Sequence, residues 1–349
     1  MLLLTLRDLV YRRTRFVVVV VLGALVFALL FVMTGLVEQF NSEPADTVAA
    51  IGADTWVVPE GVSSPFTAAA AVPIAALDAV IAENTAPVVT SRSSVVVEPG
   101  AEPVQVILIG HEIDALGSPP TVAGRAVSSP GEVVVDETLD LAVGDEVTMV
   151  GQPFTVVGET RRTTLLAGVP VVFVVLSDAQ SLTFGAADVI SGALVEGEPT
   201  SIPPGAKVMT ADEVTQSALE PLEGAIASID LVRALLWMVA AIIVGAVVYL
   251  SALDRQRDFA VLKAVGAPNR ALLGSLALQA VFVALLAVAV AAIVQIFLAP
   301  RFPLAVTVPD RAFWQLPVSA VIMALIAGAA GMRKVLRADP SQAFSGAGS

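Results

Sequence analysis

Residues 235–298 read LLWMVAAIIVGAVVYLSAL, then DRQRDFAVLKAVGAPNR, then ALLGSLALQAVFVALLAVAVAAIVQIFL. Each outer run is long enough to cross a bilayer as a helix, which takes about 20 apolar residues. The middle run is amphipathic, with apolar residues such as Phe259 and Leu262 beside charged residues such as Arg257 and Lys263. It is too polar to insert and too apolar for a free linker. This pattern favours a helix on the membrane surface that a soluble partner can contact.

The composition is that of a membrane protein. Of 349 residues, 56% are hydrophobic and only 15% are charged. The absence of cysteine excludes disulfides and thiolate metal sites, and a single histidine, His111, argues against histidine-based catalysis and multi-histidine metal sites. No P-loop motif occurs, so an ATP molecule that drives this protein is bound by another polypeptide. We expect no catalytic site and no cofactor in this chain.

One apolar run precedes a long mixed region and three follow it. The first is longer than the apolar core of a signal peptide and lacks a clear cleavage site, so we interpret it as a retained helix. The predicted order is an N-terminal segment (1–15), a first span (16–37), an α+β domain (38–230), a second span (234–253), a coupling segment (254–270), a third span (271–298), a loop (299–312), a fourth span (313–332) and a tail (333–349). The predicted fold class is therefore an α-helical membrane protein with four transmembrane helices, arranged 1+3, and an inserted α+β domain.

Residues 38–230 contain short β-branched runs bounded by Gly, Pro, Asp or Ser, which predict strands. The predicted strands are Thr55–Val58, Ser94–Glu98, Val104–Ile109, Glu132–Asp136, Glu146–Val150, Phe154–Gly158 and Val171–Leu176. Residues 144–158 predict a hairpin whose turn is Gly151-Gln152-Pro153. Helices are predicted at Ile74–Ile81, Ser177–Leu182 and Ala211–Ile229.

Basic residues set the predicted orientation. The two termini and the coupling segment are basic, whereas residues 38–230 hold 27 acidic and five basic residues. The positive-inside rule then places both termini and the coupling segment in the cytoplasm and the α+β domain outside, in a multi-pass protein of the plasma membrane.

Few polar residues stand out as functional. His111, in Gly-His-Glu-Ile-Asp, is interpreted as a surface-loop histidine at a strand end rather than a metal or haem ligand. Gln279 and Gln295 are polar residues of the third span, and packing between helices is a better explanation for them than contact with a substrate. The acidic surface needs no explanation beyond solvation, because no calcium-loop motif is present.

The coupling segment also resembles a known family signature. Residues 250–270, LSALDRQRDFAVLKAVGAPNR, are similar to the cytoplasmic signature of the FtsX-like, MacB-type ABC transporter permeases, which include DevC-like and HrtB-like members. The matching positions are Asp254, Arg255, Arg257, Asp258, Lys263, Ala264, Val265, Gly266, Ala267 and Arg270, with Asp at 254 and 258 where Glu is commoner. Residues 132–160 resemble the strand-rich periplasmic core domain of MacB-type permeases. The likeness covers the whole chain and looks closest to actinobacterial members.

This resemblance implies a half-transporter. Two copies would form a homodimer in the lipid bilayer, and each would dock a cytoplasmic ABC ATPase that carries the ATP and magnesium. Nucleotide binding would then move the domains outside the membrane, an activity called mechanotransmission, in support of efflux. The resemblance assigns the coupling to Arg255, Arg257, Asp258, Phe259, Leu262, Lys263, Val265, Gly266, Ala267 and Pro268.

Two other functions remain open at this stage. An FtsX-like regulator of cell-wall enzymes would have the same layout, with an effector protein outside the cell. A membrane-anchored binding module would also fit, although a simple anchor needs no docking helix. The sequence does not identify a substrate, and nothing in it favours a nucleic-acid partner.

Overall fold

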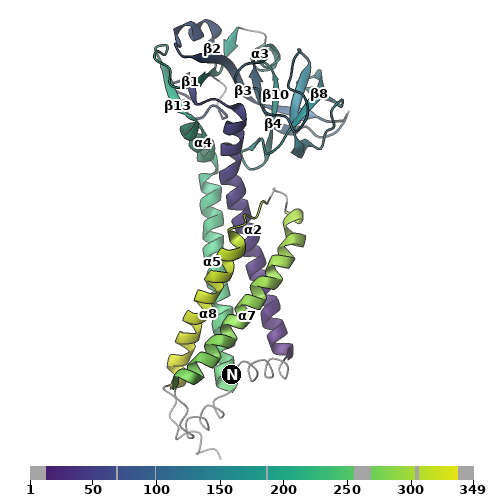
Figure 1. The fold of residues 1–349 in the computed structure, drawn as a ribbon. Coiled ribbons are helices and arrows are strands. Elements are labelled where there is room, and N and C mark those ends of the chain that lie inside the picture. Colours follow the sequence, from purple (N-terminus) through teal and green to yellow (C-terminus); the bar gives the residue numbers. More distant parts are fainter. Residues whose placement is uncertain are drawn as a thin grey trace, which may run out of the picture. The chain divides into compact units, whose positions relative to one another are not determined.

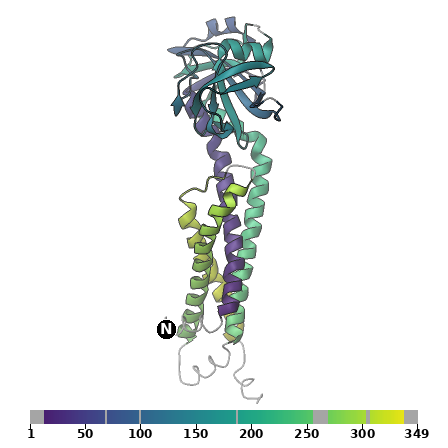
Figure 2. The ribbon, with the colours of Figure 1, turned by 90° about the vertical axis from the view of Figure 1, so that its right-hand side faces the viewer.

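The computed structural model describes residues 13–67, 70–98, 100–185, 188–254, 269–302 and 306–336. The chain forms two compact units (Figures 1 and 2). The helical unit comprises Met1–Glu38 and Ala227–Ser349, and the α+β domain comprises Gln39–Ile226. We describe each unit by itself.

Four long helices contribute to the helical unit: α2 (Arg13–Ile51), α5 (Glu223–Asp254), α7 (Asn269–Leu298) and α8 (Ala312–Leu336). Three helical stretches of the described chain are long and apolar enough to cross a membrane, Val17–Ile51, Ala211–Ala246 and Ala277–Arg301, and α8 adds a shorter apolar run, Ala312–Ile326. One helix precedes the α+β domain in the sequence and three follow it. This confirms the predicted 1+3 fold class.

The α+β domain is built on one sheet of 11 strands. Its main strands are β1 (Thr55–Pro59), β3 (Asn84–Val96), β4 (Val104–His111), β6 (Glu132–Asp136), β7 (Glu146–Met149), β8 (Gln152–Thr160), β10 (Val169–Val175), β12 (Gly192–Glu196) and β13 (Ala206–Thr210). The short strands are β5 (Ala123–Gly124) and β9 (Thr164–Leu165), and β2 (Val72–Pro73) pairs separately with β11 (Val189–Ile190).

Six of these strands close into a ring. The sheet order runs β13-β1-β12-β3-β4-β10-β6-β8-β5, and β7 pairs with both β3 and β8. The closed ring is therefore β3-β4-β10-β6-β8-β7, and β12, β1 and β13 extend the sheet outward from β3. Figure 2 shows the strands curving around one another. β3 is the strand at which the sheet forks.

Two apolar cores explain the sequence of the central strands. One lies inside the ring and includes Leu108, Met149 and Val172, and the other lies outside it and includes Trp56, Ile109 and Phe173. β4 and β10 are parallel and have buried residues on both faces, so their sequences are nearly continuous apolar runs. Helix α3 (Leu176–Phe184) packs on β4, while α4 (Ala211–Leu219) contributes Val214 and Ala218 to the outer core.

Most predicted strands are confirmed, but three details were wrong. β3 is 13 residues long and begins ten residues before the predicted strand, at Asn84. The turn of the β7–β8 hairpin is Val150-Gly151, because both residues have positive φ (49° and 80°) and Met149 pairs directly with Gln152. Pro153, predicted in the turn, lies in β8 opposite Thr148.

Candidate functional site

The predicted coupling residues lie outside the described part of the chain. This applies to Arg255, Arg257, Asp258, Phe259, Leu262, Lys263, Val265, Gly266, Ala267 and Pro268. The structure does describe the helices on either side of them, since α5 ends at Asp254 and α7 begins at Asn269. Their assignment to coupling stays a prediction from the sequence.

Small residues form many of the contacts inside the helical unit, beside larger side chains such as Phe27 and Phe31. On α7, the buried alanines follow helical spacing on one face: Ala280, Ala284, Ala287 and Ala291. On α8, the buried residues lie four apart, at Ala312, Leu316, Ala320 and Ala324. α7 and α8 pack against each other, and they lie side by side in Figure 1. A Cβ atom placed on Gly23 of α2 would lie 3.2 Å from the Ala287 Cβ, so close helix approach depends on small side chains here.

Large apolar side chains lie on the opposite, exposed surfaces of the same helices. Examples are Ile242, Ile293 and Ile326, which are 62%, 60% and 65% exposed. Helix α5 is the least covered of the four. Among its described side chains only Ala240 and Val244 are buried. Such a surface suits lipid or another membrane helix, not water.

The two glutamines of the third helix are both buried. Gln279 is 4% exposed and Gln295 is 7% exposed, and both lie in α7. Sixteen residues of α-helix separate them, which corresponds to roughly 24 Å along the axis at 1.5 Å per residue. They cannot contact one small substrate together, so they do not constitute a single polar site.

The middle of α2 is tied to the segment that precedes α8. The Arg311 guanidinium donates a hydrogen bond to the Glu38 carboxylate and forms an ion pair with it. Nearby, a Cβ atom on Gly35 would lie 2.7 Å from Val306 Cγ1, so this glycine leaves room for the segment to contact the helix. These contacts join the first and last helices of the unit.

His111 is buried at the end of β4, so the predicted surface-loop position was wrong. Its side chain is 1% exposed, its Nδ1 lies 2.8 Å from the Glu112 carbonyl oxygen, and its ring lies edge-on to Phe173 at 6.4 Å between centroids. Burial lowers the pKa of His111 below its usual 6.5. The neutral imidazole is therefore part of the core, which the sequence does not reveal because the outer core covers this strand end.

Asp136, the last residue of β6, is the most enclosed carboxylate of the domain that the structure describes, at 0% exposed. Its Oδ1 accepts hydrogen bonds from the Thr138 N–H (3.0 Å) and hydroxyl (2.7 Å). Its Oδ2 accepts from the Thr163 N–H (2.7 Å) and hydroxyl (2.8 Å). The carboxylate therefore joins the end of β6 to the segment that follows β8, and its role is structural.

Sequence reasoning missed a polar cavity of about 530 Å³ beside β3. The signal was present as five successive polar residues, Thr90-Ser91-Arg92-Ser93-Ser94, in the middle of the domain. A strand that packs in a sheet normally alternates apolar and polar residues or is apolar throughout. The predicted strand instead began at Ser94, and no element was predicted for residues 90–93.

Comparison with known proteins gives the family. An uncharacterized ABC transporter permease of Mycobacterium bovis, Mb2592, is 40% identical over 99% of this chain and 100% of its own length. A second uncharacterized ABC transporter permease, Rv0072 of Mycobacterium tuberculosis, is 37% identical over the same shares. Residues 231–340 match the family described as FtsX-like permease C-terminal. The chain belongs to the FtsX-like ABC transporter permeases.

The residues matched in this permease include α7, α8 and the whole predicted coupling segment. Among solved structures, the periplasmic region of MacB from Actinobacillus actinomycetemcomitans is 15% identical, with a TM-score of 0.34, over 50% of this chain and 97% of that one. The extracellular domain of the transporter YknZ from Gram-positive bacteria is 14% identical, with a TM-score of 0.29, over 50% of this chain and 93% of that one.

Proposed function

We propose that this permease is the membrane subunit of a homodimeric transporter that exports its substrate with energy from a separate cytoplasmic ATPase. The observation that carries the proposal is the full-length similarity to ABC transporter permeases in a chain without a P-loop. The ATPase would bind ATP and magnesium, and this chain would convert its cycle into movement.

The distribution of charge supports an orientation for the proposed transporter. Both termini and the coupling segment would lie in the cytoplasm, because basic residues gather in these three segments. The α+β domain would then lie outside. These basic residues are Arg7, Arg12, Arg13, Arg15, Arg255, Arg257, Lys263, Arg270, Arg333, Lys334 and Arg337. A plasma-membrane protein with an even number of spans and both ends inside is consistent with this count.

The exposed surface of α5 supports a dimer. A second copy packed against α5 would cover apolar side chains that the described helices of one copy leave exposed, including Leu235, Met238 and Ile242. The same helix leads directly into the coupling segment in the sequence. A movement of the ATPase at the coupling segment would therefore be passed directly to α5 and to the proposed dimer contact. Lipid can cover this surface as well, and a measurement of the oligomeric state distinguishes a dimer contact from a lipid contact.

Helix continuity supports mechanical transmission. The boundary between the two units falls between Glu38 and Gln39, inside α2, and between Ile226 and Ala227, inside α5. At both boundaries the chain is α-helical. We propose that these two helices carry the movement of the helical unit to the α+β domain.

The test is to isolate the tagged permease from its native membranes in mild detergent and identify what comes with it. We expect an ABC ATPase in equal amount, in a complex sized for two copies of each chain. The double variant V265D/G266D should lose the ATPase while inserting normally, since two carboxylates desolvate poorly at an apolar contact. Thr307→Asp, an exposed position in the segment before α8, is the matched control and should retain it.

Each alternative predicts a different result. Cell-wall enzymes recovered beside the ATPase would favour the FtsX-like regulator over the exporter. A permease recovered alone in several detergents would favour the membrane-anchored binding module. Retention of an active ATPase by V265D/G266D would show that coupling does not occur at residues 255–268.

A further inference from the structure

β3 has a gap in its pairing at the fork of the sheet. On one edge it pairs with β4 continuously, from Val88 to Val95. On the other edge, pairing with β12 ends at Val88 and pairing with β7 begins at Val95. Between these two strands, residues 89–94 have no strand partner on this edge among the residues that the structure describes. The gap spans six residues, about 20 Å of extended chain.

The backbone at the start of the gap is held by a side chain, not by a strand. The Ser191 N–H donates to the Val88 carbonyl oxygen at 2.9 Å. The Ser191 hydroxyl accepts from the Thr90 N–H at 3.0 Å and donates to the Thr90 carbonyl at 3.2 Å. Since alternate residues of a strand direct their N–H and C=O groups to the same edge, Arg92 and Ser94 also present theirs to the gap.

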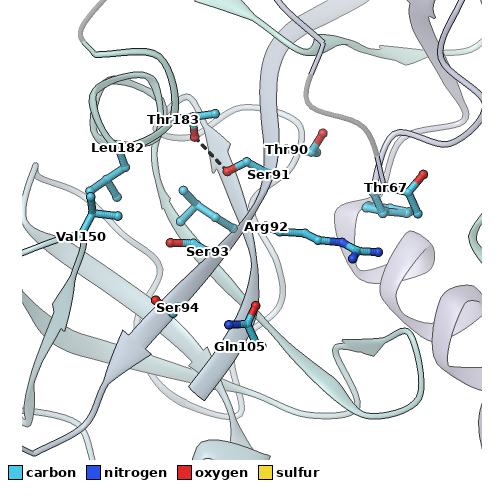
Figure 3. A pocket seen from close by; sticks show the side chains of 12 residues that line it. Thr67, Thr90, Ser91, Arg92, Ser93, Ser94, Gln105, Val150, Leu182 and Thr183 are labelled. Atoms are coloured by element: carbon cyan, nitrogen blue, oxygen red, sulfur yellow. Dashed lines mark hydrogen bonds between the residues drawn. The ribbon is translucent and has the colours of Figure 1, made fainter. Parts of the chain in front are cut away.

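The 530 Å³ cavity lies at this gap. It is lined by five successive residues of β3, Thr90 to Ser94, and by side chains that include Thr67, Gln105 and Thr183 (Figure 3). Successive strand residues point to opposite faces, so a cavity that reaches five in a row is located at the strand edge and not over one face. Its position matches the unpaired backbone.

Most of the side chains that line the cavity are polar, and one of the hydroxyls has no partner among the described residues. The Ser91 and Thr183 hydroxyls lie 2.8 Å apart, as the dashed line in Figure 3 shows. The Ser93 hydroxyl is buried and has no hydrogen-bond partner among the described residues. A buried hydroxyl normally has a partner, so an incoming polar group would gain a hydrogen bond here.

Charge indicates the kind of ligand. The α+β domain has four arginines, and three of them form ion pairs: Arg125 with Glu132, Arg161 with Glu137 and Arg162 with Asp46. The fourth, Arg92, is exposed and has no ion pair with a described residue. Figure 3 shows its side chain extending toward the side of the strand on which Thr67 lies. An unpaired guanidinium beside an open backbone edge suits a carboxylate.

We propose that the gap in β3 binds an extended peptide segment that carries a carboxylate side chain. The peptide adds a short strand between β12 and β7, pairs its backbone with Arg92 and Ser94, and places its carboxylate on the Arg92 guanidinium. Backbone pairing supplies affinity and the side-chain contacts supply selectivity, as in other cases of strand addition. The proposal uses the α+β domain alone and does not depend on the transporter assignment.

The absence of cysteine makes the test selective. Ser94→Cys in the full chain, in detergent, introduces a single thiol at the gap. It is incubated, in a fixed excess of 2-mercaptoethanol, with acetylated and amidated pentapeptides that carry either Asp or Asn and one cysteine, supplied as its mixed disulfide with 2-mercaptoethanol. The introduced thiolate attacks the peptide's disulfide, forms the protein–peptide disulfide and releases 2-mercaptoethanol. Mass spectrometry measures the fraction of chain labelled. We expect the Asp peptide to label about three- to tenfold more than the Asn peptide, and Arg92→Gln to remove that preference.

The matched control is Thr155→Cys on β8. Thr155 is an exposed strand residue whose backbone is paired on both edges, with Glu132 of β6 and Glu146 of β7. At this position we expect no preference for the Asp peptide. N-methylation of the peptide backbone should lower labelling at position 94 and leave labelling at position 155 unchanged. If Ser94→Cys does not fold, Gln105→Cys replaces it, because Gln105 pairs with Ser94 across β3 and β4.

Three results would overturn the proposal. The first is an equal Asp-to-Asn ratio at positions 94 and 155, and the second is a preference that survives Arg92→Gln. The third is labelling by 3-mercaptopropionate, supplied as the same mixed disulfide, that equals labelling by the Asp peptide, which would indicate a site for small anions without strand addition. If N-methylation of the peptide backbone leaves labelling at position 94 unchanged, this would likewise indicate a small-anion site and not strand addition.

Discussion

Replacement of Asp136 by Ala tests how the α+β domain is held together. The side chain is fully buried and accepts four hydrogen bonds, two from backbone N–H groups and two from threonine hydroxyls. The hydroxyls can find other acceptors, since the Thr163 hydroxyl already lies 2.5 Å from the Thr160 hydroxyl. Thr163 is buried, so its N–H group cannot turn to water, and an unpaired buried group costs about 1–3 kcal/mol. Thr138 is exposed, and its N–H group loses a hydrogen bond to a charged acceptor, which contributes about 1.5–3 kcal/mol. We expect a loss of roughly 3–4 kcal/mol in the free energy of unfolding.

For domains of 150–250 residues, 1 kcal/mol shifts the unfolding temperature by about 2–4 °C, so the expected decrease is roughly 6–16 °C. The assay is tryptophan fluorescence during heating of the full chain in detergent. Trp237→Phe and Trp314→Phe in the background leave the buried Trp56 of the domain core as the only tryptophan. Asp145→Ala is the control, because this exposed carboxylate accepts one backbone hydrogen bond, from Ala142 at 2.8 Å, and should cost less than about 1 kcal/mol. Equal shifts for the two variants would refute the reasoning.

Two further predictions concern the same domain. Because burial lowers the pKa of His111 in the folded state, its stabilising effect is complete above pH 6.5, and it decreases as the pH falls through the lowered pKa. The unfolding temperature of His111→Phe should thus fall less between pH 7 and pH 5 than that of the wild type, and parallel curves would contradict this. Gly110→Ala should cost about 1–3 kcal/mol, since its Cβ would lie 2.1 Å from that of Ala179 on α3. Gly61→Ala, with no heavy atom within 4 Å of its Cβ, should be nearly neutral in the same thermal scan.

The sequence was most informative where a single physical constraint dominates. Long apolar runs predicted the helices. Inside a bilayer no water can pair with the backbone N–H and C=O groups, and a helix pairs them within one segment. Central strands such as β6, with the sequence EVVVD, were predicted correctly because burial on both faces selects β-branched residues.

The strands that were missed depend on distant partners. β12 and β13 lie far along the chain from the fork, and their short sequences, GALVE and AKVMT, carry little periodic signal. The polar half of β3 was missed because it is a strand by virtue of its pairing with β4, not by its own residue pattern. The cavity at residues 90–94 follows from a change of partner along β3, and a change of partner leaves no local mark on the sequence.

Closure of the six-strand ring has a consequence for the solution behaviour of the domain. Apart from the gap in β3, the strands of the closed ring are paired with neighbours on both sides, so most of the ring offers no edge for edge-to-edge polymerisation. One end of the sheet is the short strand β5, and the other is β13, whose described pairing is with β1. β13 carries Lys207, a charged residue of the kind that discourages edge-to-edge pairing. We therefore expect the domain to resist edge-to-edge polymerisation at high concentration. Lys207→Val should then make the protein prone to concentration-dependent aggregation.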